Sequence, residues 1–221
     1  MDTVIFDLDG TLLNTLEDLT DSVNHAMEEF GFPLHTIEEI RSFVGNGAPT
    51  LIERSIPQGK ENPSYDAVLA AFKEHYAAHC EDKTNPYEGI MELLAQLKEK
   101  GYRMAVVSNK FDGAVKRLCG KYFGDYIEAA IGESADVKRK PAPDTVYQAL
   151  CELSCDASRA VYVGDSEVDI QTAKNASLPC ISVTWGFRTE ERLKDAGADG
   201  KLMIRNPQEL VPLLLKLQGE G

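Results

Sequence analysis

Cysteine is scarce and irregularly placed in this chain of 221 residues. The five cysteines are Cys80, Cys119, Cys151, Cys155 and Cys180. An odd and scattered set indicates reduced thiols rather than a disulfide framework. Cys151 and Cys155 lie four residues apart, but no second thiol pair completes a zinc site. We therefore expect a cytoplasmic protein.

Long apolar runs and an excess of basic residues are also missing. No run approaches the length of a transmembrane helix, and the N-terminal residues lack the basic and apolar regions of a signal peptide. Lys and Arg number 23 against 36 Asp and Glu, which gives a net charge of -13. This charge argues against nucleic acid or an anionic membrane as the main partner. An anionic substrate would need a few well-placed cations or a metal.

Two acidic residues directly follow a short apolar segment near the N-terminus. Thr3 to Phe6 has the composition of a buried strand. Asp7 and Asp9 come next at a spacing of two, so strand alternation would put both on one side. Neighbouring carboxylates repel each other unless a cation or a shared proton compensates them. Gly10 permits a sharp turn. Taken alone, this segment would also fit a strand that ends in an ordinary Asp-Gly turn.

A helical segment follows and contains no convincing strand. Apolar residues recur at helical spacing behind Thr15 in an N-cap position, and Gly31 ends the first helix. The pattern predicts helices over 16–30, 36–43, 49–55 and 64–79, with Gly45-Asn46-Gly47 as a break. We interpret residues 14–83 as a small inserted bundle of helices, a cap.

Strands and helices alternate through the remainder of the chain. The pattern predicts strands over 103–107, 126–131, 160–163, 180–184 and 201–204, and helices over 89–100, 113–119, 144–153, 168–176, 190–196 and 207–217. Such alternation is typical of a parallel sheet with helices on both faces. We therefore predict an α/β fold with a doubly wound, Rossmann-like core made of residues 1–13 and 84–221.

Polar residues stand where the predicted parallel strands end, which is where such sheets bind ligands. Ser108, Asn109 and Lys110 follow one strand, and Asp165 follows another, with Asp169 four residues beyond. Lys140 lies in the loop before Pro141. Each of these residues alone would be typical of a turn or of the solvent-exposed surface. Their order, each at a strand end, predicts a shared site.

These residue types suit a phosphoryl group. Clustered carboxylates need a hard cation, and Mg²⁺ takes oxygen ligands while keeping waters and a phosphate oxygen. Asp7, Asp165 and the Asp9 carbonyl would supply ligands, with Asp169 orienting water or a ligand. Ser108 and backbone amides would hold phosphoryl oxygens, and a lysine would neutralise their charge. Lys140 is the candidate for that lysine.

The ordered motifs resemble those of the haloacid dehalogenase superfamily of phosphatases. They are Asp7-Leu8-Asp9-Gly10-Thr11, Ser108-Asn109, Lys140-Pro141 and Gly164-Asp165-Ser166-Glu167-Val168-Asp169. The resemblance covers essentially the whole chain and includes the helical cap after the first motif. It implies that Asp7 is the nucleophile that forms an aspartyl phosphate, and that Asp9 is the general acid and base. It also implies a central first strand.

Within the superfamily the chain is most similar to phosphoglycolate phosphatases. Phe43-Val44-Gly45-Asn46-Gly47, Val183-Thr184-Trp185-Gly186-Phe187 and Ala196-Gly197-Ala198-Asp199 carry this resemblance. It implies a small phosphorylated metabolite, 2-phosphoglycolate, as substrate, and a cap loop whose Gly45 and Asn46 reach the leaving group. We also expect Thr11, Asn109 and Lys110 to bind substrate. Asn14-Thr15 departs from the Asp-Thr of many relatives, at the cap hinge.

Other functions share these motifs. A sugar phosphomutase, a pyrophosphatase or a nucleotidase is compatible with the same core. A phosphonate hydrolase of the superfamily lacks the acid at Asp9 and uses a cap lysine, whereas the cap lysines here (Lys60, Lys73 and Lys83) lie in or near loops or on a polar face. The inserted cap and Asp9 argue against a receiver domain, and a catalytically idle phospho-ligand binder is disfavoured because no motif residue is lost. We expect a monomer or a weak homodimer.

Some further residues have weaker signals. Arg41 and Arg188, like Lys110, are cations that could hold a substrate carboxylate. His75, His79 and Cys80 have a spacing that would suit a transition metal, but His25 and His35 lie on other helices. We therefore interpret the two histidines on the fourth helix as an ordinary polar face. Trp185 is expected to pack in the core.

Overall fold

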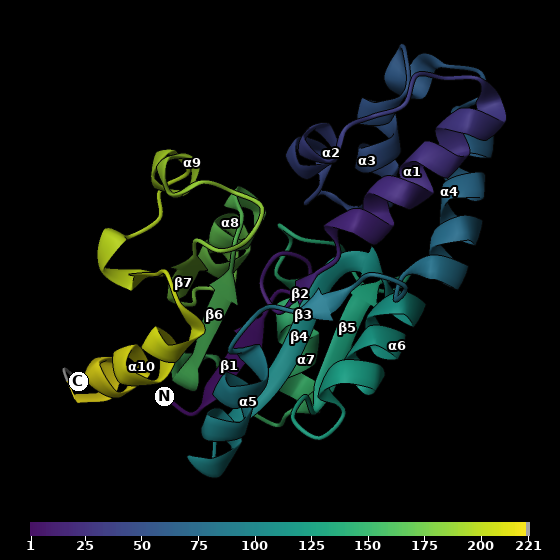
Figure 1. Ribbon diagram of the computed structural model, residues 1–221. Helices are drawn as coiled ribbons and strands as arrows, with labels where there is room; N and C mark the ends of the chain where they lie inside the picture. Colours follow the sequence, from purple (N-terminus) through teal and green to yellow (C-terminus); the bar gives the residue numbers. More distant parts are fainter. Residues whose placement is uncertain (220–221) are drawn as a thin grey trace.

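The computed structural model describes residues 1–219. A parallel sheet with helices on both faces forms the lower part of the molecule, and four helices form a separate bundle above it (Figure 1). The bundle, called the cap below, stands over the end of the sheet at which the first strand stops. The predicted fold class is confirmed.

The main sheet has six strands in the order β5-β4-β1-β6-β7-β8, and every neighbouring pair is parallel. The first strand is therefore central, as predicted. The strands are β1 (Thr3–Phe6), β4 (Arg103–Phe111), β5 (Ala129–Glu133), β6 (Ala160–Gly164), β7 (Cys180–Val183) and β8 (Met203–Ile204).

Strand alternation divides the core into two layers. Val4 and Phe6 of β1 face one side, where they join the apolar residues of α5, α6 and α10. Ile5 faces the other side, with residues of α7 and α8. All of β1 is buried because both faces are covered, which explains its continuous apolar sequence. The helices are α5 (Ile90–Glu99), α6 (Asp112–Phe123), α7 (Asp144–Glu152), α8 (Glu167–Asn175), α9 (Glu190–Asp195) and α10 (Leu210–Gly219).

The cap consists of α1 (Leu16–Phe30), α2 (Ile37–Phe43), α3 (Gly47–Ser55) and α4 (Tyr65–His79). Helix α1 lies along α4 (Figure 1). Thr36 and Glu39 form a reciprocal capping box that fixes the start of α2. Thr15 occupies the N-cap position of α1 as predicted, but its hydroxyl makes no capping hydrogen bond. Short 3₁₀ turns lie at Gly59–Glu61, Ala157–Arg159, Gly200–Leu202 and Pro207–Glu209.

A short antiparallel ribbon joins the cap to the sheet. It pairs β2 (Leu13–Asn14) with β3 (Asn85–Pro86). Above it, the Asp18 carboxylate accepts hydrogen bonds from the backbone amides of Lys83 and Thr84. The chain thus leaves the core and returns to it at one place. The sequence pattern did not predict these two-residue strands.

Several element boundaries differ from prediction, and three of these differences have a clear local cause. Strand β5 begins at Ala129 rather than Tyr126, because the preceding residues form a turn in which Tyr126 and Ile127 donate to the Phe123 carbonyl. Strand β4 continues to Phe111 instead of stopping at Val107, and its register against β5 shifts in between. Strand β8 is two residues long, since a 3₁₀ turn takes up the first part of the predicted segment.

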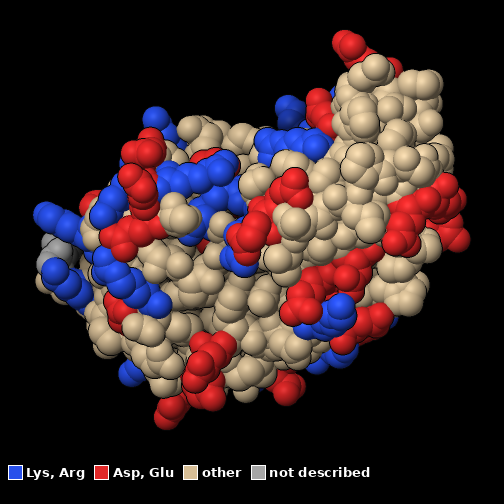
Figure 2. All heavy atoms as spheres, turned by 45° about the horizontal axis from the view of Figure 1, so that its top comes forward, with Lys and Arg blue, Asp and Glu red and all other residues tan. Residues whose placement is uncertain are grey.

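The charged side chains are unevenly distributed on the molecular surface. On the face in Figure 2, basic and acidic side chains mix over the left part, and acidic side chains gather along the right side. No helix within residues 1–219 combines the length and apolar character needed to cross a membrane. The expected absence of nucleic-acid and membrane partners stays a prediction.

Candidate active site

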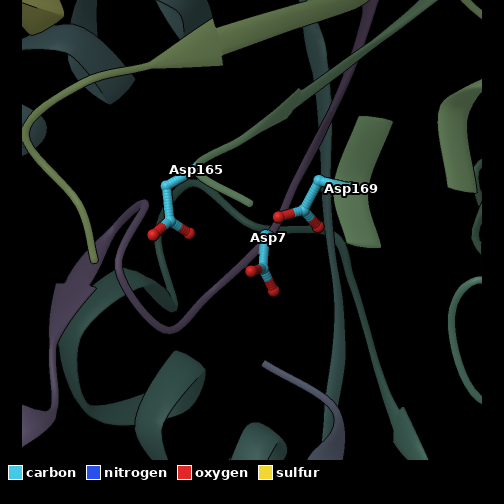
Figure 3. A group of neighbouring side chains, drawn as sticks. All are labelled: Asp7, Asp165 and Asp169. Carbon is cyan, nitrogen blue, oxygen red and sulfur yellow. The ribbon is translucent and has the colours of Figure 1, made fainter. Parts of the chain in front are cut away.

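Three aspartates converge at the carboxyl end of the central strands. Asp7 follows β1, Asp165 follows β6, and Asp169 lies in the first turn of α8. All three are buried, and each offers a carboxylate oxygen within 4.8 Å of the others (Figure 3). The carboxylates at these strand ends therefore lie close together, as the sequence predicts.

Burial and mutual repulsion make the ionised forms of these acids unfavourable. Burial, followed by the charge of Asp169, raises the pKa of Asp7 well above its usual range. The same two causes raise the pKa of Asp165 to about 7. A cation among the three carboxylates would favour the ionised forms. The site thus has the electrostatics of an acidic metal-binding cluster.

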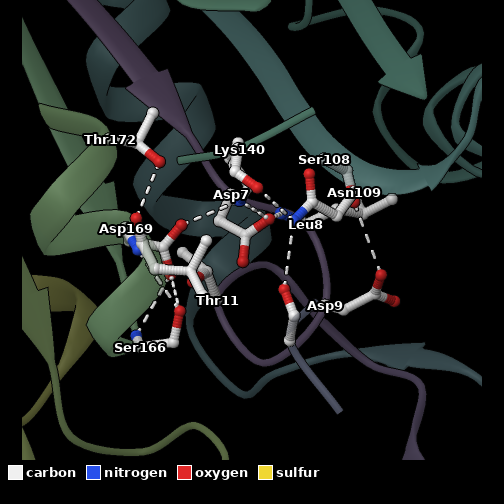
Figure 4. A network of polar contacts seen from close by, with 12 residues as sticks. Asp7, Leu8, Asp9, Thr11, Ser108, Asn109, Lys140, Ser166, Asp169 and Thr172 are labelled. Carbon is white, nitrogen blue, oxygen red and sulfur yellow. Dashed lines mark hydrogen bonds and ion pairs between the residues drawn. The ribbon is translucent and has the colours of Figure 1, made fainter. Parts of the chain in front are cut away.

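Lys140 provides part of the compensation. Its Nζ lies 2.8 Å from Asp7 Oδ1 and 2.8 Å from Asp169 Oδ1 (Figure 4). It also donates to the Tyr162 hydroxyl at 3.1 Å. Burial disfavours its charge, but the carboxylates of Asp169 and Asp7 outweigh this and raise the pKa of Lys140. The lysine is therefore a fixed positive charge at the cluster.

The Asp169 carboxylate is fully engaged by neighbouring donors. Its Oδ1 accepts from Lys140 and, at 2.9 Å, from the Tyr162 hydroxyl. Its Oδ2 accepts from the backbone amide and hydroxyl of Ser166, at 3.1 and 2.5 Å. In this geometry Asp169 fixes Lys140 and the start of α8 as well as contributing charge to the cluster.

Asp9 faces a different set of groups. Its Oδ1 accepts a hydrogen bond from the Thr15 hydroxyl at 2.6 Å and lies 2.9 Å from Lys110 Nζ. Its Oδ2 is 3.5 Å from Ser108 Oγ. The Asp9 side chain therefore stands beside the acidic cluster without belonging to it. Because the Thr15 hydroxyl donates to Asp9, it is turned away from the start of α1 and makes no capping hydrogen bond.

A break in strand pairing presents the polar residues of β4. The register against β5 shifts between Val107 and Phe111, and Ser108, Asn109 and Lys110 occupy the irregular stretch. Such irregularities re-aim side chains at strand ends. Lys110 points to Asp9 and donates to the Tyr76 hydroxyl of the cap at 2.6 Å.

The amide group of Asn109 connects three parts of the site. Its Nδ2 donates to the carbonyls of Gly45 in the cap and Lys140 in the core, at 3.2 and 3.0 Å. Its Oδ1 is buried and has no hydrogen-bond partner among residues 1–219. Asn109 therefore ties the cap loop to the lysine loop and leaves one acceptor unpaired near the cavity.

The loop after β7 closes around Asp165. The Phe187 amide donates to Asp165 Oδ2 at 2.7 Å, and the Thr11 hydroxyl to Oδ1 at 3.3 Å. A Cβ on Gly186 would lie 2.3 Å from the Gly10 carbonyl oxygen and 2.4 Å from Asp165. Gly10 itself has φ +90, which favours glycine. The two glycines allow the turns to approach this closely.

A small cavity of about 60 Å³ lies between the cap and the strand ends. Apolar cap residues, among them Leu19, Leu51 and Phe72, form its upper wall. The predicted site residues that line it are Asp7, Asp9, Gly45, Ser108, Asn109, Lys110, Lys140 and Asp165. Three others do not line it, namely Thr11, Asn46 and Asp169. A cavity of this size suits a small ligand.

Arg188 links the region after β7 to the cap. It is buried, donates to the carbonyls of Arg41 and Val44, and pairs with Glu167 at 2.9 Å. Asn46, in the same cap loop, contributes its carbonyl to Arg139 at 3.4 Å. The predicted cation Arg188 therefore holds the cap against the core in this structure.

The residues present fit a divalent cation. Asp7, Asp165 and Asp169 are the three carboxylates of the cluster, and the ammonium group of Lys140 contacts two of them. When all three carboxylates are ionised, two negative charges are left without compensation in a buried oxygen-rich site, which matches the charge and ligand preference of a hard divalent ion.

Several residues at the site were not identified from the sequence. The hydroxyls of Tyr76 and Tyr162 accept hydrogen bonds from Lys110 and Lys140. Thr15, Phe187 and Glu167 hold Asp9, Asp165 and Arg188. Tyr162 carried a weak signal, as a tyrosine within an otherwise apolar buried strand. The others depend on contacts between distant segments, which no local pattern shows.

Known proteins show the same combination of sequence and fold. A family model described as haloacid dehalogenase-like hydrolase matches residues 4–183. A phosphoglycolate phosphatase of Mesorhizobium japonicum is 34% identical over 190 residues, covering 83% of each chain. One from Pseudomonas savastanoi pv. phaseolicola is 31% identical over 223 residues, covering 98% of this chain and 81% of the relative.

Solved structures agree with these relatives. A protein of Lactobacillus delbrueckii subsp. bulgaricus, proposed to be a phosphoglycolate phosphatase, superimposes with a TM-score of 0.89 at 36% identity, over 95% of this chain and 97% of its own. The CbbY protein of Rhodobacter sphaeroides, solved in complex with phosphate, gives 0.76 at 29% identity, over 95% and 96%.

The chain belongs to the haloacid dehalogenase-like hydrolases. Within that family it is a phosphatase-type enzyme of the phosphoglycolate phosphatase-like kind. The superfamily, the enzyme class and the closer resemblance predicted from the motifs are thereby confirmed. The roles of individual site residues stay predictions.

Proposed function

We propose that this chain is a Mg²⁺-dependent phosphatase that hydrolyses a small phosphomonoester, with 2-phosphoglycolate as its preferred substrate. The observation that carries the proposal is the buried cluster of Asp7, Asp165 and Asp169, neutralised in part by Lys140 and open to a small cavity beside Asp9. Phosphoryl transfer requires this combination of a nucleophile, an acid and preorganised positive charge.

In the proposed reaction the Asp7 carboxylate attacks phosphorus and forms an aspartyl phosphate. The ester P–O bond breaks, and the leaving oxygen takes a proton from Asp9. Water then attacks phosphorus, Asp9 accepts its proton, and the bond to Asp7 breaks to release phosphate. Asp7 Oδ1 is held by the Leu8 amide at 2.7 Å and by Lys140, whereas Oδ2 has no hydrogen-bond partner within the described residues, which supports the nucleophilic role.

The remaining residues bind and orient. Ser108 and Lys140 would contact the transferring phosphoryl oxygens. Asp7, Asp165 and the Asp9 carbonyl would hold Mg²⁺, which supplies positive charge to those oxygens when bound. Asp169, whose oxygens already accept from Lys140, Tyr162 and Ser166, would act by fixing Lys140.

The proposed substrate follows from the cavity and the relatives. A volume of about 60 Å³ with an apolar cap wall favours a short leaving group. Lys110 lines this cavity and is the candidate for contact with a carboxylate, with Asn109, Gly45, Asn46 and Thr11 arranging the surrounding loops. The named relatives are phosphoglycolate phosphatases.

We also propose the predicted division into a core (1–13 and 84–221) and a cap (14–83). The β2–β3 ribbon supports it, because the chain passes between the two parts there.

Phosphate release across a substrate panel, with Mg²⁺ and with chelator, tests the function. The panel holds 2-phosphoglycolate, hexose 1- and 6-phosphates, pyrophosphate and nucleoside monophosphates. The proposal expects kcat/KM to be highest by far for 2-phosphoglycolate and activity to vanish with chelator. A different preferred substrate would overturn the substrate assignment. Sugar phosphate interconversion without phosphate release would identify a mutase, and no reaction at all would leave an idle binder.

A further inference from the structure

The cap wall of the active-site cavity is apolar except at one residue. Tyr76, on α4, lines the cavity and presents a hydroxyl group. Every other described cap residue in this wall is a glycine or has an apolar side chain, as Leu51 and Phe72 do. A polar group in such a wall is costly unless it has polar partners. The Tyr76 hydroxyl is thus the one polar side-chain group that the described part of the cap brings to the cavity.

Aromatic packing fixes the position of the Tyr76 ring. The residue is 1% exposed. Its ring stacks on that of Phe72 with centroids 5.6 Å apart and packs edge to face with that of Phe111, at the end of β4, at 6.1 Å. The Lys110 ammonium group lies 4.5 Å from the centroid of the Tyr76 ring, within the range of a cation–π contact. The Tyr76 hydroxyl is therefore held in place before a ligand arrives.

Two hydrogen-bond donors that lie beside each other lack acceptors. An ammonium group has three N–H donors, and a tyrosine hydroxyl has one O–H donor. Lys110 Nζ directs one donor to Asp9 Oδ1 at 2.9 Å and one to the Tyr76 oxygen at 2.6 Å. The third N–H of Lys110 and the O–H of Tyr76 have no acceptor within residues 1–219. Because both residues line the cavity, a ligand there can supply the missing acceptors.

The chemistry of these two donors favours a carboxylate as the acceptor. A tyrosine hydroxyl keeps its proton near neutral pH, and the neighbouring ammonium group adds a positive charge. A carboxylate offers two acceptor oxygens and a negative charge. Hydrogen bonds to an ionised acceptor are also stronger than those between neutral groups. The pair of donors therefore matches a carboxylate better than it matches a neutral oxygen.

The other cations that line the cavity are committed to other groups. Lys140 belongs to the aspartate cluster, and Arg188 is engaged by an acidic neighbour and by cap carbonyls. Lys110 is left for an anionic group of the ligand, but Asp9 already offsets its charge. A carboxylate at this place therefore needs the further donor that Tyr76 provides.

From this arrangement we propose that Tyr76 is a specificity-determining residue that selects a leaving group carrying a carboxylate. Its hydroxyl donates to one carboxylate oxygen, and Lys110 donates to the other. Tyr76 belongs to the cap and Lys110 to β4, so the carboxylate is bound from both sides of the cavity. The inference rests on the proposed phosphatase function and names the cap residue that recognises the substrate class. Tyr76 takes no part in making or breaking a bond.

Calorimetric binding of 2-phosphoglycolate and of ethyl phosphate, both with Mg²⁺, tests this selection. Ethyl phosphate has a methyl group in the place of the carboxylate. The full chain carries Asp7→Asn, so that turnover consumes neither ligand, and is compared with and without Tyr76→Phe, which removes only the hydroxyl. Tyr76→Phe should lower the preference for 2-phosphoglycolate over ethyl phosphate about tenfold, because a hydrogen bond to a charged group is lost.

Tyr65→Phe, in the same Asp7→Asn chain, is the matched control. Tyr65 lies on the same helix but does not line the cavity, and its hydroxyl donates to the Pro49 carbonyl at 2.9 Å. This variant should keep the preference, and circular dichroism would show that each variant is folded. An unchanged preference in Tyr76→Phe, an equal loss of affinity for both ligands, or no preference in the Asp7→Asn chain itself would overturn the role of Tyr76.

Phosphate release separates this inference from the proposed function. With Asp7 intact, Tyr76→Phe should have a kcat/KM for 2-phosphoglycolate about tenfold below that of the native chain. An unchanged kcat/KM would overturn the role of Tyr76 and leave the phosphatase function standing. No phosphate release by the native chain from any substrate of the panel would overturn the function, whereas a binding preference that depends on Tyr76 would still support the carboxylate site.

Discussion

The Lys140 ammonium group contacts two of the three clustered aspartates and is itself buried. Lys140→Ala should lower kcat/KM by about 10²- to 10³-fold, because one preorganised charge at the transferring phosphoryl group is lost. Lys138→Ala, in the same loop but exposed, is the control and should leave kcat/KM near wild type. Steady-state kinetics with excess Mg²⁺ would decide, and equal values for both variants would exclude Lys140 from the site.

Asp7 is the residue whose side chain should be irreplaceable. Asp7→Asn keeps the shape but removes the nucleophile, so turnover should fall by at least about 10³-fold. In chelator, the free energy of unfolding of the Asp7→Asn variant should not be lower than that of the wild type. Burial and the charge of Asp169 already oppose the ionised Asp7 carboxylate in the wild type and raise the pKa of Asp7. A single-turnover assay and a thermal melt would measure the two effects. Retained turnover would contradict the nucleophilic role.

At this scale the sequence was most informative where a residue follows a strand. Asp7, Asp165 and Lys140 could be predicted to meet because parallel strands end at one edge of a sheet. Tyr76 could not, since its contact with Lys110 depends on how the cap packs on the core. Thr11 was expected at the substrate, but its hydroxyl is directed to Asp165.

At the scale of elements, Arg188 connects the loop after β7 to the cap. Arg188 and Arg192 both pair with Glu167, but only Arg188 also donates to cap carbonyls. Arg188→Ala should therefore raise KM several-fold by loosening the closed cap, and Arg192→Ala should not. Kinetics of the two variants would show the difference. Identical KM values would mean that Arg188 does not hold the cap during turnover.

The turn between β7 and α9 is equally constrained. Gly186→Ala would force a methyl group against the Gly10 carbonyl and Asp165, so it should displace the metal ligand and raise the Mg²⁺ concentration needed for half-maximal activity about tenfold or more. Gly200→Ala has open space around its Cβ and serves as the control. An unchanged Mg²⁺ titration for Gly186→Ala would show that the turn accommodates the methyl group without displacing Asp165.

Element prediction succeeded for long periodic segments and failed for short ones. The four cap helices and the alternating core elements follow from apolar spacing. Strands β2 and β3 are two residues each, too short for any pattern, and β3 contains Pro86. Strand β4 was expected to end where its polar residues begin, whereas the register shift lets the strand continue through them.

For the whole molecule, the acidic cluster predicts a linkage between stability, pH and Mg²⁺. The pKa of Asp165 is about 7 in the folded protein against an ordinary 3.8. Between these values the folded state holds a proton that the unfolded chain has released, so without metal the free energy of unfolding should fall as pH rises through this window. The contribution is of the order of a few kcal/mol.

Mg²⁺ should reverse this loss, since it favours the ionised carboxylates. Its effect on the unfolding temperature should be small at pH 5 and several degrees at pH 8. Thermal melts with Mg²⁺ or chelator at both pH values would measure it. An Asp165→Asn variant should lose most of the Mg²⁺ effect. A Mg²⁺ effect that is equal at pH 5 and pH 8 would contradict the linkage.

The β2–β3 ribbon has a consequence for how such enzymes diversify. Both passages of the chain between cap and core lie side by side there, and neither strand belongs to the six-stranded sheet. Insertions, deletions or exchange of the intervening segment therefore leave the register of every sheet strand intact. Recombination at residues 14 and 85 would transplant a leaving-group pocket onto unchanged core strands, provided that the new segment keeps partners equivalent to Thr15 and Tyr76 for Asp9 and Lys110. The ribbon therefore marks a natural junction for protein engineering.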